Sequence, residues 1–240
     1  MTGETALGVE AMQGKIVLVT GANGGLGRNV TQAFLHAGAT VVGTSRRIEA
    51  SEFPSAAFTA LSGELSSPSG ARAVVDFVTS KFGRLDVLAH TVGGFAGGSS
   101  LASTDDATFQ LMMDMNLNSA FYLLRAAIPL LRKNHGGRIV AIGSRAAVDP
   151  GAGVGAYSAS KAALVSLIRT VALENKDVEL TANIILPGTM DTPANRNAMP
   201  TADVSKWVQP ANVAALITWL AGDTGSETNG AVIPMYGSEV

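Results

Sequence analysis

The sequence predicts an α/β fold, a single Rossmann-like doubly wound domain with a seven-stranded parallel sheet flanked by helices. Two observations predict it. Short apolar segments alternate with longer segments of helical periodicity along almost the whole chain of 240 residues, and this alternation is typical of a parallel sheet covered on both faces. The short segments are also apolar at consecutive positions, which indicates strands that are buried on both sides.

Seven segments fit buried strands because apolar residues run without interruption between turn signals. They are residues 16–20, 40–44, 57–61, 85–89, 138–143, 180–186 and 231–234. No change of composition and no linker separates them. We therefore expect one domain over residues 14–240, preceded by a loose N-terminal extension over residues 1–13.

Helices are predicted where apolar residues recur at helical spacing. They are residues 25–37, 67–82, 105–133, 155–174 and 210–221. Gly38 and Gly83 are placed to end the first two, because glycine readily adopts the left-handed conformation of a C-cap. The segment 105–133 fits either two helices or one long bent helix, with Ser103 or Thr104 as its N-cap.

The composition excludes several classes of protein. Seventeen basic and nineteen acidic residues give a net charge of -2 without a run of like charges, whereas a nucleic-acid binder usually carries a basic stripe. The chain has no cysteine, which excludes disulfides and cysteine-built zinc sites, and we predict no metal site. No signal-peptide pattern and no apolar segment of ~18 residues is present. We expect a soluble cytoplasmic protein without membrane partners.

A glycine-rich turn follows the first predicted strand and opens the first helix. Gly21, Gly25 and Gly27 lie in the segment Thr20-Gly-Ala-Asn-Gly-Gly-Leu-Gly27. Glycine lets the backbone turn tightly and approach a pyrophosphate, whose charge the helix N-terminus stabilises. The alternative is an ordinary tight turn in a chain with 27 glycines.

The pattern Thr20-Gly-x-x-x-Gly-x-Gly27 resembles the short-chain dehydrogenase/reductase family, which implies a nicotinamide cofactor. In this family an acidic residue at the end of the second strand favours NAD(H), and Ser45 takes its place here, followed by Arg46 and Arg47. A carboxylate would repel a 2′-phosphate, whereas an arginine can bind one in a bidentate fashion. We therefore predict NADP(H) over NAD(H); the alternative is that both arginines are solvated loop charges.

Other positions carry the resemblance along the chain. It implies further cofactor contacts at Asn23, Leu26, Glu64, Leu65, Thr91, Gly93, Pro187, Gly188, Thr189 and Thr192. The clearest departure is at residues 88–94, where the family has Asn-Asn-Ala-Gly and only Gly93 matches. His90 replaces the first asparagine. We expect it to have a structural or cofactor-bordering role, the alternative being a catalytic imidazole.

Tyr157 and Lys161 are four residues apart on a predicted helix, and therefore lie on one face. A Tyr-x-x-x-Lys pair is common by chance, but Ser144 at the end of the fifth strand and Asn116 upstream match the family order. The resemblance implies that Tyr157 is the general acid and base. Lys161 would lower the pKa of the phenol, ordinarily ~10, and hold the nicotinamide ribose. Ser144 would orient the substrate carbonyl, and Asn116 would hold a water that relays protons.

The substrate side is less defined. Residues 189–209 are polar and interrupted by prolines, and the resemblance implies that they form a lid over the ligand. Met199 and Trp207 either line a pocket or anchor this lid. Phe95, Arg145, Ala146 and Val148 lie on loops expected to face the substrate. Arg145 either binds a substrate carboxylate or, as we favour, points to solvent.

Together these features predict an enzyme that transfers a hydride between NADP(H) and a small-molecule carbonyl or alcohol. One alternative is a 3-oxoacyl thioester reductase. Another, of a different class, is a dinucleotide-sensing binding protein without turnover. An epimerase or dehydratase that retains its cofactor is a further alternative, for which the chain looks short. The resemblance also implies a homodimer or homotetramer, built through the helices at 105–133 and 155–174.

Overall fold

The computed structural model describes residues 12–238. It contains one sheet of seven parallel strands in the order β3-β2-β1-β4-β5-β6-β7, which confirms the predicted fold class. The strands are β1 (Ile16–Thr20), β2 (Thr40–Ser45), β3 (Phe58–Ser62), β4 (Val87–His90), β5 (Arg138–Ile142), β6 (Thr181–Pro187) and β7 (Val232–Met235).

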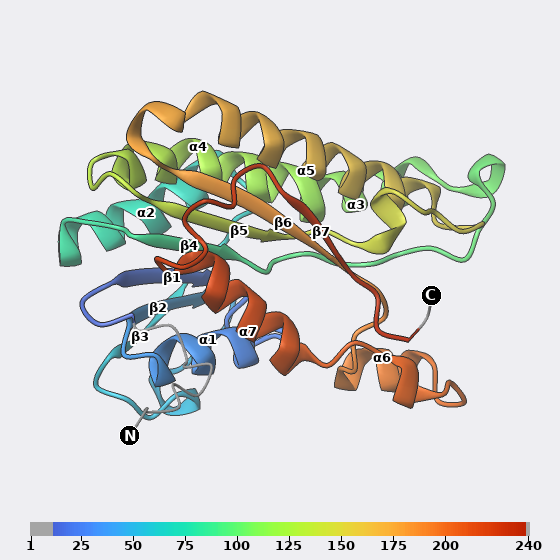
Figure 1. Cartoon of the computed structure of the whole chain (residues 1–240). Coiled ribbons are helices and arrows are strands. Elements are labelled where there is room, and N and C mark those ends of the chain that lie inside the picture. Colours follow the sequence, from blue (N-terminus) through green and yellow to red (C-terminus); the bar gives the residue numbers. More distant parts are fainter. Residues whose placement is uncertain (1–11, 239–240) are drawn as a thin grey trace, which may run out of the picture.

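Helices cover both faces of the sheet (Figure 1). One layer contains α2, α4 and α5, and the opposite layer contains α1 and α7. The helices are α1 (Gly27–His36), α2 (Pro68–Phe82), α3 (Asp106–Met113), α4 (Ser119–Arg132), α5 (Gly155–Glu174), α6 (Pro193–Ala198) and α7 (Pro210–Ala221). This arrangement explains why the strands are apolar at every position, since both of their faces are covered.

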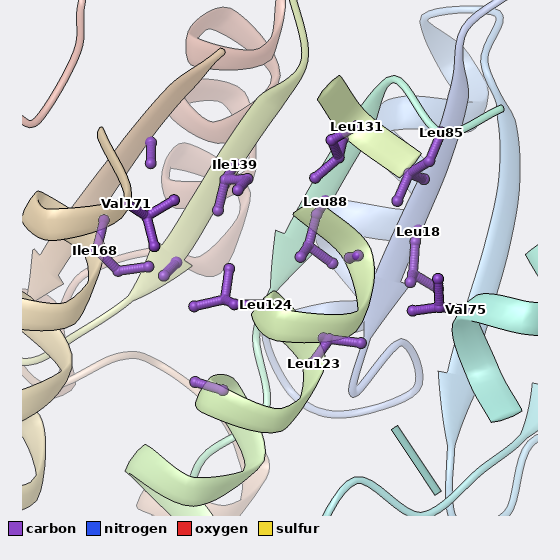
Figure 2. Packing of buried hydrophobic residues seen from close by; sticks show 14 of the residues in the cluster. Leu18, Val75, Leu85, Leu88, Leu123, Leu124, Leu131, Ile139, Ile168 and Val171 are labelled. Atoms are coloured by element: carbon purple, nitrogen blue, oxygen red, sulfur yellow. The ribbon is translucent and has the colours of Figure 1, made fainter. Parts of the chain in front are cut away.

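Two hydrophobic cores lie on either side of the sheet. Leu18 of β1 and Leu88 of β4 point toward α2, α4 and α5, where Figure 2 shows them packed among leucines and valines. Val17 and Val19, the neighbours of Leu18, point to the other side, toward α1 and α7. Each fully buried side chain of this size contributes roughly 1.5–3 kcal/mol through the area removed from water.

The segment predicted as one bent helix or two is a continuous helical run with a π-helical turn inside it. This turn, Asp114–Asn118, separates α3 from α4. The N-cap of α3 is Asp105, whose carboxylate accepts a hydrogen bond from the Thr108 amide at 2.7 Å. The predicted N-caps at Ser103 and Thr104 are wrong. Ser103 belongs to the preceding short turn of 3₁₀ helix, and Thr104 is the C-cap of that turn.

Most of the predicted N-terminal extension, residues 1–11, lies outside the described residues. Met12 is fully buried, and its amide donates to the Ala37 carbonyl at 2.8 Å. The packed domain therefore includes Met12. Within residues 12–238, no helix is both long enough and apolar enough to cross a membrane.

The strand order reverses between β1 and β4, which are neighbours in the sheet. The chain leaves β1 toward α1 on one face and leaves β4 toward α3, on the opposite face (Figure 1). In doubly wound sheets, this reversal opens a crevice at the carboxyl ends of the strands, where ligands bind. The glycine turn after β1 and the loop after β4 border this crevice.

Candidate active site

The glycine turn leaves no room for side chains at its critical positions. A Cβ atom added to Gly27 would lie 1.9 Å from the Gly21 carbonyl oxygen, and Gly21 itself has a left-handed φ of 65°. A Cβ atom on Gly25 would lie 2.9 Å from Cγ2 of Thr192. The backbone can thus approach a ligand closely at the N-terminus of α1, where amide groups and the helix dipole favour a phosphate.

The residues around this turn differ in what they can offer a ligand. The side chains of Leu26 and Leu65 are buried in the two hydrophobic cores, so only their backbones can face a cofactor. The side-chain amide of Asn23 donates to the Arg47 carbonyl at 2.7 Å and to the Glu52 carboxylate at 3.1 Å. It therefore holds the loop after β2 against the turn.

The loop after β2 presents two exposed arginines. Arg46 and Arg47, together with Ser62, Gly63 and Glu64, line a shallow hollow at the edge of the crevice. Neither arginine has an ion-pair partner among residues 12–238. Their charges are therefore available to an anionic ligand.

The segment from β6 to α7 crosses over the glycine turn. The amide of Gly188 donates to the Met235 carbonyl, and the amide of Val208 donates to the Thr189 carbonyl at 2.8 Å. Thr192 is buried against Gly25, and its hydroxyl caps α6. These contacts bring the predicted residues that follow Pro187 next to the predicted phosphate turn.

Met199 and Trp207 have different positions in this segment. Trp207 is buried at 6% exposure and anchors the segment to the domain, whereas Met199 is 40% exposed. Asp191 and Arg196 form a bidentate ion pair across the base of α6. The segment is thus fixed at its base and presents Met199 at its surface.

The four predicted catalytic residues come together at the carboxyl end of β5. Ser144 follows this strand, and its hydroxyl lies close enough to the phenol of Tyr157, in the first turn of α5, to lower the pKa of that phenol. Lys161 lies one turn later on α5 and is 4% exposed. Its ammonium donates to the Ile142 carbonyl at 2.9 Å, which binds the helix to the strand.

Asn116 lies inside the π-helical turn, a distortion that is common at functional sites. Its side-chain oxygen accepts from the Gly94 amide at 2.9 Å, and its amide donates to the Gly94 carbonyl and to the Ser160 hydroxyl, both at 3.1 Å. Ser160 in turn donates to the Tyr157 carbonyl. Asn116 thereby joins the loop after β4 to α5.

Sequence reasoning missed Ser160 and Gly94, which complete this network. Ser160 lies between Tyr157 and Lys161 in the sequence, and a small polar residue at this position could have indicated that it belongs to the site. Gly93 was predicted, and its role is steric. A Cβ atom there would lie 2.9 Å from the Asn116 side-chain oxygen and 3.0 Å from the Lys161 ammonium.

Burial determines the proton affinities of the catalytic pair. It raises the pKa of Tyr157, and the nearby Ser144 hydroxyl acts in the opposite direction. Burial also lowers the pKa of Lys161 to about 8. Desolvation disfavours the phenolate, so in the chain by itself it acts against the lowering of the phenol pKa expected from Lys161 and the oxidised nicotinamide ring.

His90 is buried in the network that links β1 to β4. Its Nδ1 shares a hydrogen bond of 3.0 Å with the Thr20 hydroxyl, and the Thr91 hydroxyl donates to the Thr20 carbonyl at 2.6 Å. Burial, aided by the charge of Lys161, lowers the pKa of His90 to about 3. The imidazole is therefore neutral near pH 7, and the geometry supports the structural role over the catalytic one.

The depressed pKa of His90 predicts an acid-sensitive stability. The unfolded chain binds a proton at His90 below pH ~6.5, whereas the native state does so only near pH 3. The free energy of unfolding should fall as the pH decreases through this window, by about 2 kcal/mol at pH 5. In His90→Asn this decrease should be absent, which urea unfolding at pH 7 and pH 5 measures. His36→Asn, at an exposed position, is the control, and an equal pH dependence in His90→Asn would contradict the prediction.

Arg145, expected near the substrate, is engaged with its own loop. Its guanidinium forms an ion pair with Asp149 at 2.8 Å and lies over the Tyr236 ring, 5.1 Å from the centroid. It neither points freely to solvent nor is available to a substrate carboxylate. The adjacent Ala146 amide donates to the Ser144 hydroxyl at 3.2 Å, which helps to orient Ser144.

Comparison with known proteins agrees with this geometry. A family model described as short chain dehydrogenase matches residues 15–203. A rhamnolipids biosynthesis 3-oxoacyl-[acyl-carrier-protein] reductase from Pseudomonas aeruginosa is 32% identical over 248 residues, covering 95% of this chain and 96% of that protein. A 7alpha-hydroxysteroid dehydrogenase from Escherichia coli is 28% identical, covering 95% of each chain.

Solved structures show the same architecture. The Pseudomonas aeruginosa RhlG/NADP active-site complex has a TM-score of 0.87 and 31% identity, covering 95% of this chain and 96% of that one. The Thermoplasma acidophilum aldohexose dehydrogenase in ligand-free form has a TM-score of 0.86 and 25% identity, with 94% of each chain covered.

Proposed function

Because the chain belongs to the short-chain dehydrogenase family, we propose that it transfers a hydride between NADP(H) and a carbonyl or alcohol carbon. It is an NAD(P)-dependent oxidoreductase. The proposal that this site carries out the hydride transfer rests on one observation. Tyr157 lies beside Ser144 at the carboxyl edge of the sheet, one helical turn from the buried ammonium of Lys161.

The residues present fit a dinucleotide. The turn at Gly21, Gly25 and Gly27 is a cradle that Cβ atoms would fill, and it opens a helix whose N-terminus favours phosphate. The pyrophosphate would lie against this turn, beneath Thr192, and the bound cofactor would supply or accept the hydride. Thr91, Gly93 and the segment 187–192 would line the rest of its path.

Tyr157 and Ser144 would handle the substrate oxygen. Because burial raises the pKa of Tyr157, its phenol stays protonated near neutral pH and is ready to donate a proton to the developing alkoxide. Ser144 would hydrogen-bond the same oxygen and orient the carbonyl. Alcohol oxidation, the reverse reaction, would require the phenolate to accept the proton.

Lys161 and Asn116 would support this proton transfer. The Lys161 ammonium favours the phenolate that forms after donation and is placed to hold the nicotinamide ribose. Its pKa of about 8 keeps it charged at neutral pH. Asn116 fixes the position of the loop after β4 and of Ser160 beside Tyr157. A water held near Asn116 would return the proton to Tyr157 from solvent through Lys161.

The exposed arginines support a preference for NADP(H). Ser45 carries no charge that would repel a 2′-phosphate, and Glu52, the nearby carboxylate, is held by Arg28 at 2.7 Å. Arg46 and Arg47 are left to bind the phosphate, whose charge-assisted hydrogen bonds are the strong ones. Glu64 lines the same hollow, and we place it toward the adenine.

Arg46→Ala should weaken NADPH binding by about 10–100-fold, because each hydrogen bond to a charged group contributes roughly 1.5–3 kcal/mol. NADH binding should change little, since NADH has no 2′-phosphate. Titration of both cofactors by fluorescence measures the two dissociation constants. Arg72→Ala, on the exposed face of α2, is the control, and tighter binding of NADH than NADPH by the unaltered protein would refute the preference.

Three further assignments belong to this proposal. Residues 189–209 act as a lid whose base is fixed by Trp207 and by the Asp191–Arg196 pair. The chain forms a homodimer or homotetramer through α4 and α5, where Phe121 and Leu173 are exposed. The cysteine-free composition fits a reducing cytoplasm.

Absorbance at the NADPH band, followed with a panel of ketones, tests the function. A reductase consumes NADPH, whereas a dinucleotide sensor binds it without turnover. A 3-oxoacyl thioester belongs in the panel, because several relatives are named 3-oxoacyl-[acyl-carrier-protein] reductases. Preference for this thioester over simple ketones would favour that second candidate. NADPH binding without oxidation of any kind would overturn the proposed function.

A further inference from the structure

A phenylalanine lies uncovered beside the proposed catalytic tyrosine. The rings of Phe95 and Tyr157 meet edge to face, with centroids 5.0 Å apart and planes at 80°. Phe95 is nevertheless 65% exposed. A large apolar side chain that is held in a fixed place at a reaction centre and left open to water indicates a surface that a ligand covers.

Two loops build an apolar wall around this phenylalanine. The Gly98 amide donates to the Gly153 carbonyl at 2.8 Å, joining the loop after β4 to the loop before α5. A Cβ atom on Gly97 would touch the Phe95 ring and Val154, and one on Gly155 would lie 3.3 Å from Leu101. The absence of side chains at Gly97 and Gly155 therefore lets Phe95 and Leu101 pack close to the start of α5. Gly155 itself is two residues from Tyr157.

The wall continues into a small hollow without free charge. It has a volume of about 130 Å³ and is lined by backbone and hydroxyl groups of both loops. A cavity of this order accommodates a group about the size of a benzene ring. Asp105 is the single ionisable residue in its lining, and its carboxylate is occupied in capping α3.

The arginines on the loops after β5 and β6 are paired within the protein. Arg145 is bound to Asp149, and Arg196 is bound to Asp191. A substrate carboxylate or phosphate would have to break one of these pairs to gain a partner. Exposed apolar side chains, by contrast, are present on each of these loops, at Val148 and Met199.

We propose that the substrate is an uncharged ketone or aldehyde whose apolar arm lies on the Phe95 wall, defined here as Phe95, Leu101 and Val154. This inference rests on the proposed reductase function and adds the class of substrate. The carbonyl is bound at Ser144 and Tyr157, and the arm covers the exposed ring. The hydroxyl-lined hollow accepts a neutral group, and no ion pair contributes to recognition.

Steady-state kinetics with NADPH and four carbonyl compounds test the inference. Acetophenone should be reduced with a kcat/KM at least tenfold above those of acetone, glyceraldehyde and pyruvate. Phe95→Ala should lower kcat/KM for acetophenone by about 10–100-fold, because a phenyl ring loses its buried contact. Phe95→Leu, which keeps an apolar surface, should retain most of the activity, and acetone turnover should fall much less than acetophenone turnover in Phe95→Ala.

Acetone and Trp219→Ala serve as controls. A disturbed Tyr157 would lower the turnover of acetone and acetophenone equally, and that result would overturn the wall as a substrate surface. Trp219, exposed on α7, should give unaltered kinetics when replaced by alanine. Preference for pyruvate or glyceraldehyde would overturn this inference and leave the reductase function standing. Absence of turnover with every carbonyl compound, including the 3-oxoacyl thioester, would overturn both.

Discussion

Tyr157→Phe is expected to lower kcat for ketone reduction by about 10²–10⁴-fold, the usual contribution of a positioned general acid. The variant keeps the aromatic ring that packs against Phe95 and loses only the hydroxyl that lies near Ser144. The dissociation constant of NADPH should stay within a factor of about three, since no binding energy to the phosphates depends on this hydroxyl.

Stopped-flow or steady-state oxidation of NADPH, combined with a fluorescence titration of the cofactor, measures both quantities. Tyr122→Phe is the matched control, because Tyr122 lies half-buried on α4 and packs against the core away from Ser144. A Tyr157→Phe protein that retains a third or more of the original kcat would show that another group donates the proton.

Lys161→Met is expected to lower kcat/KM by about 10²–10³-fold, the typical effect of removing one preorganised electrostatic donor. The ammonium is buried, so solvent screens little of the charge that the proposed mechanism directs at the phenolate and the ribose. Methionine fills a similar volume, and the fold should survive, because the change removes a buried charge and leaves one carbonyl, that of Ile142, without its donor.

The pH profile separates this electrostatic role from a purely structural one. The pKa of Lys161 is about 8, so the ammonium is lost as the pH rises through 8. The unaltered enzyme should therefore lose activity above this pH, which gives the pH profile an alkaline limb. Lys161→Met should lack this alkaline limb. Lys133→Met, at the exposed end of α4, should retain both the activity and the limb. An alkaline limb that persists in Lys161→Met would assign it to another group.

Local patterns were sufficient to predict the seven strands and the helices other than α6. The bounds of α5 and α7 are those expected from the sequence, because helical periodicity depends on residues three and four positions apart. The order of the glycine turn, Ser144, Tyr157 and Lys161 along the chain is likewise visible in one dimension. The N-cap of α3 could not be predicted from the sequence alone. Ser103, Thr104 and Asp105 are all residue types that cap helices well, and the preceding turn of 3₁₀ helix decides which one is used.

Local sequence patterns could not predict the charge states of the active-site residues or their hydrogen-bond and ion-pair partners. His90 is neutral because it is enclosed by residues such as Thr20, which lies 70 positions away in the sequence. Arg145 was open to two interpretations until the structure placed it between Asp149 and Tyr236. Sequence alone determined the fold, the family pattern and the order of the reacting groups. The tertiary structure decided which of those groups are buried, paired or exposed, because desolvation and hydrogen bonding depend on neighbours that only folding brings together.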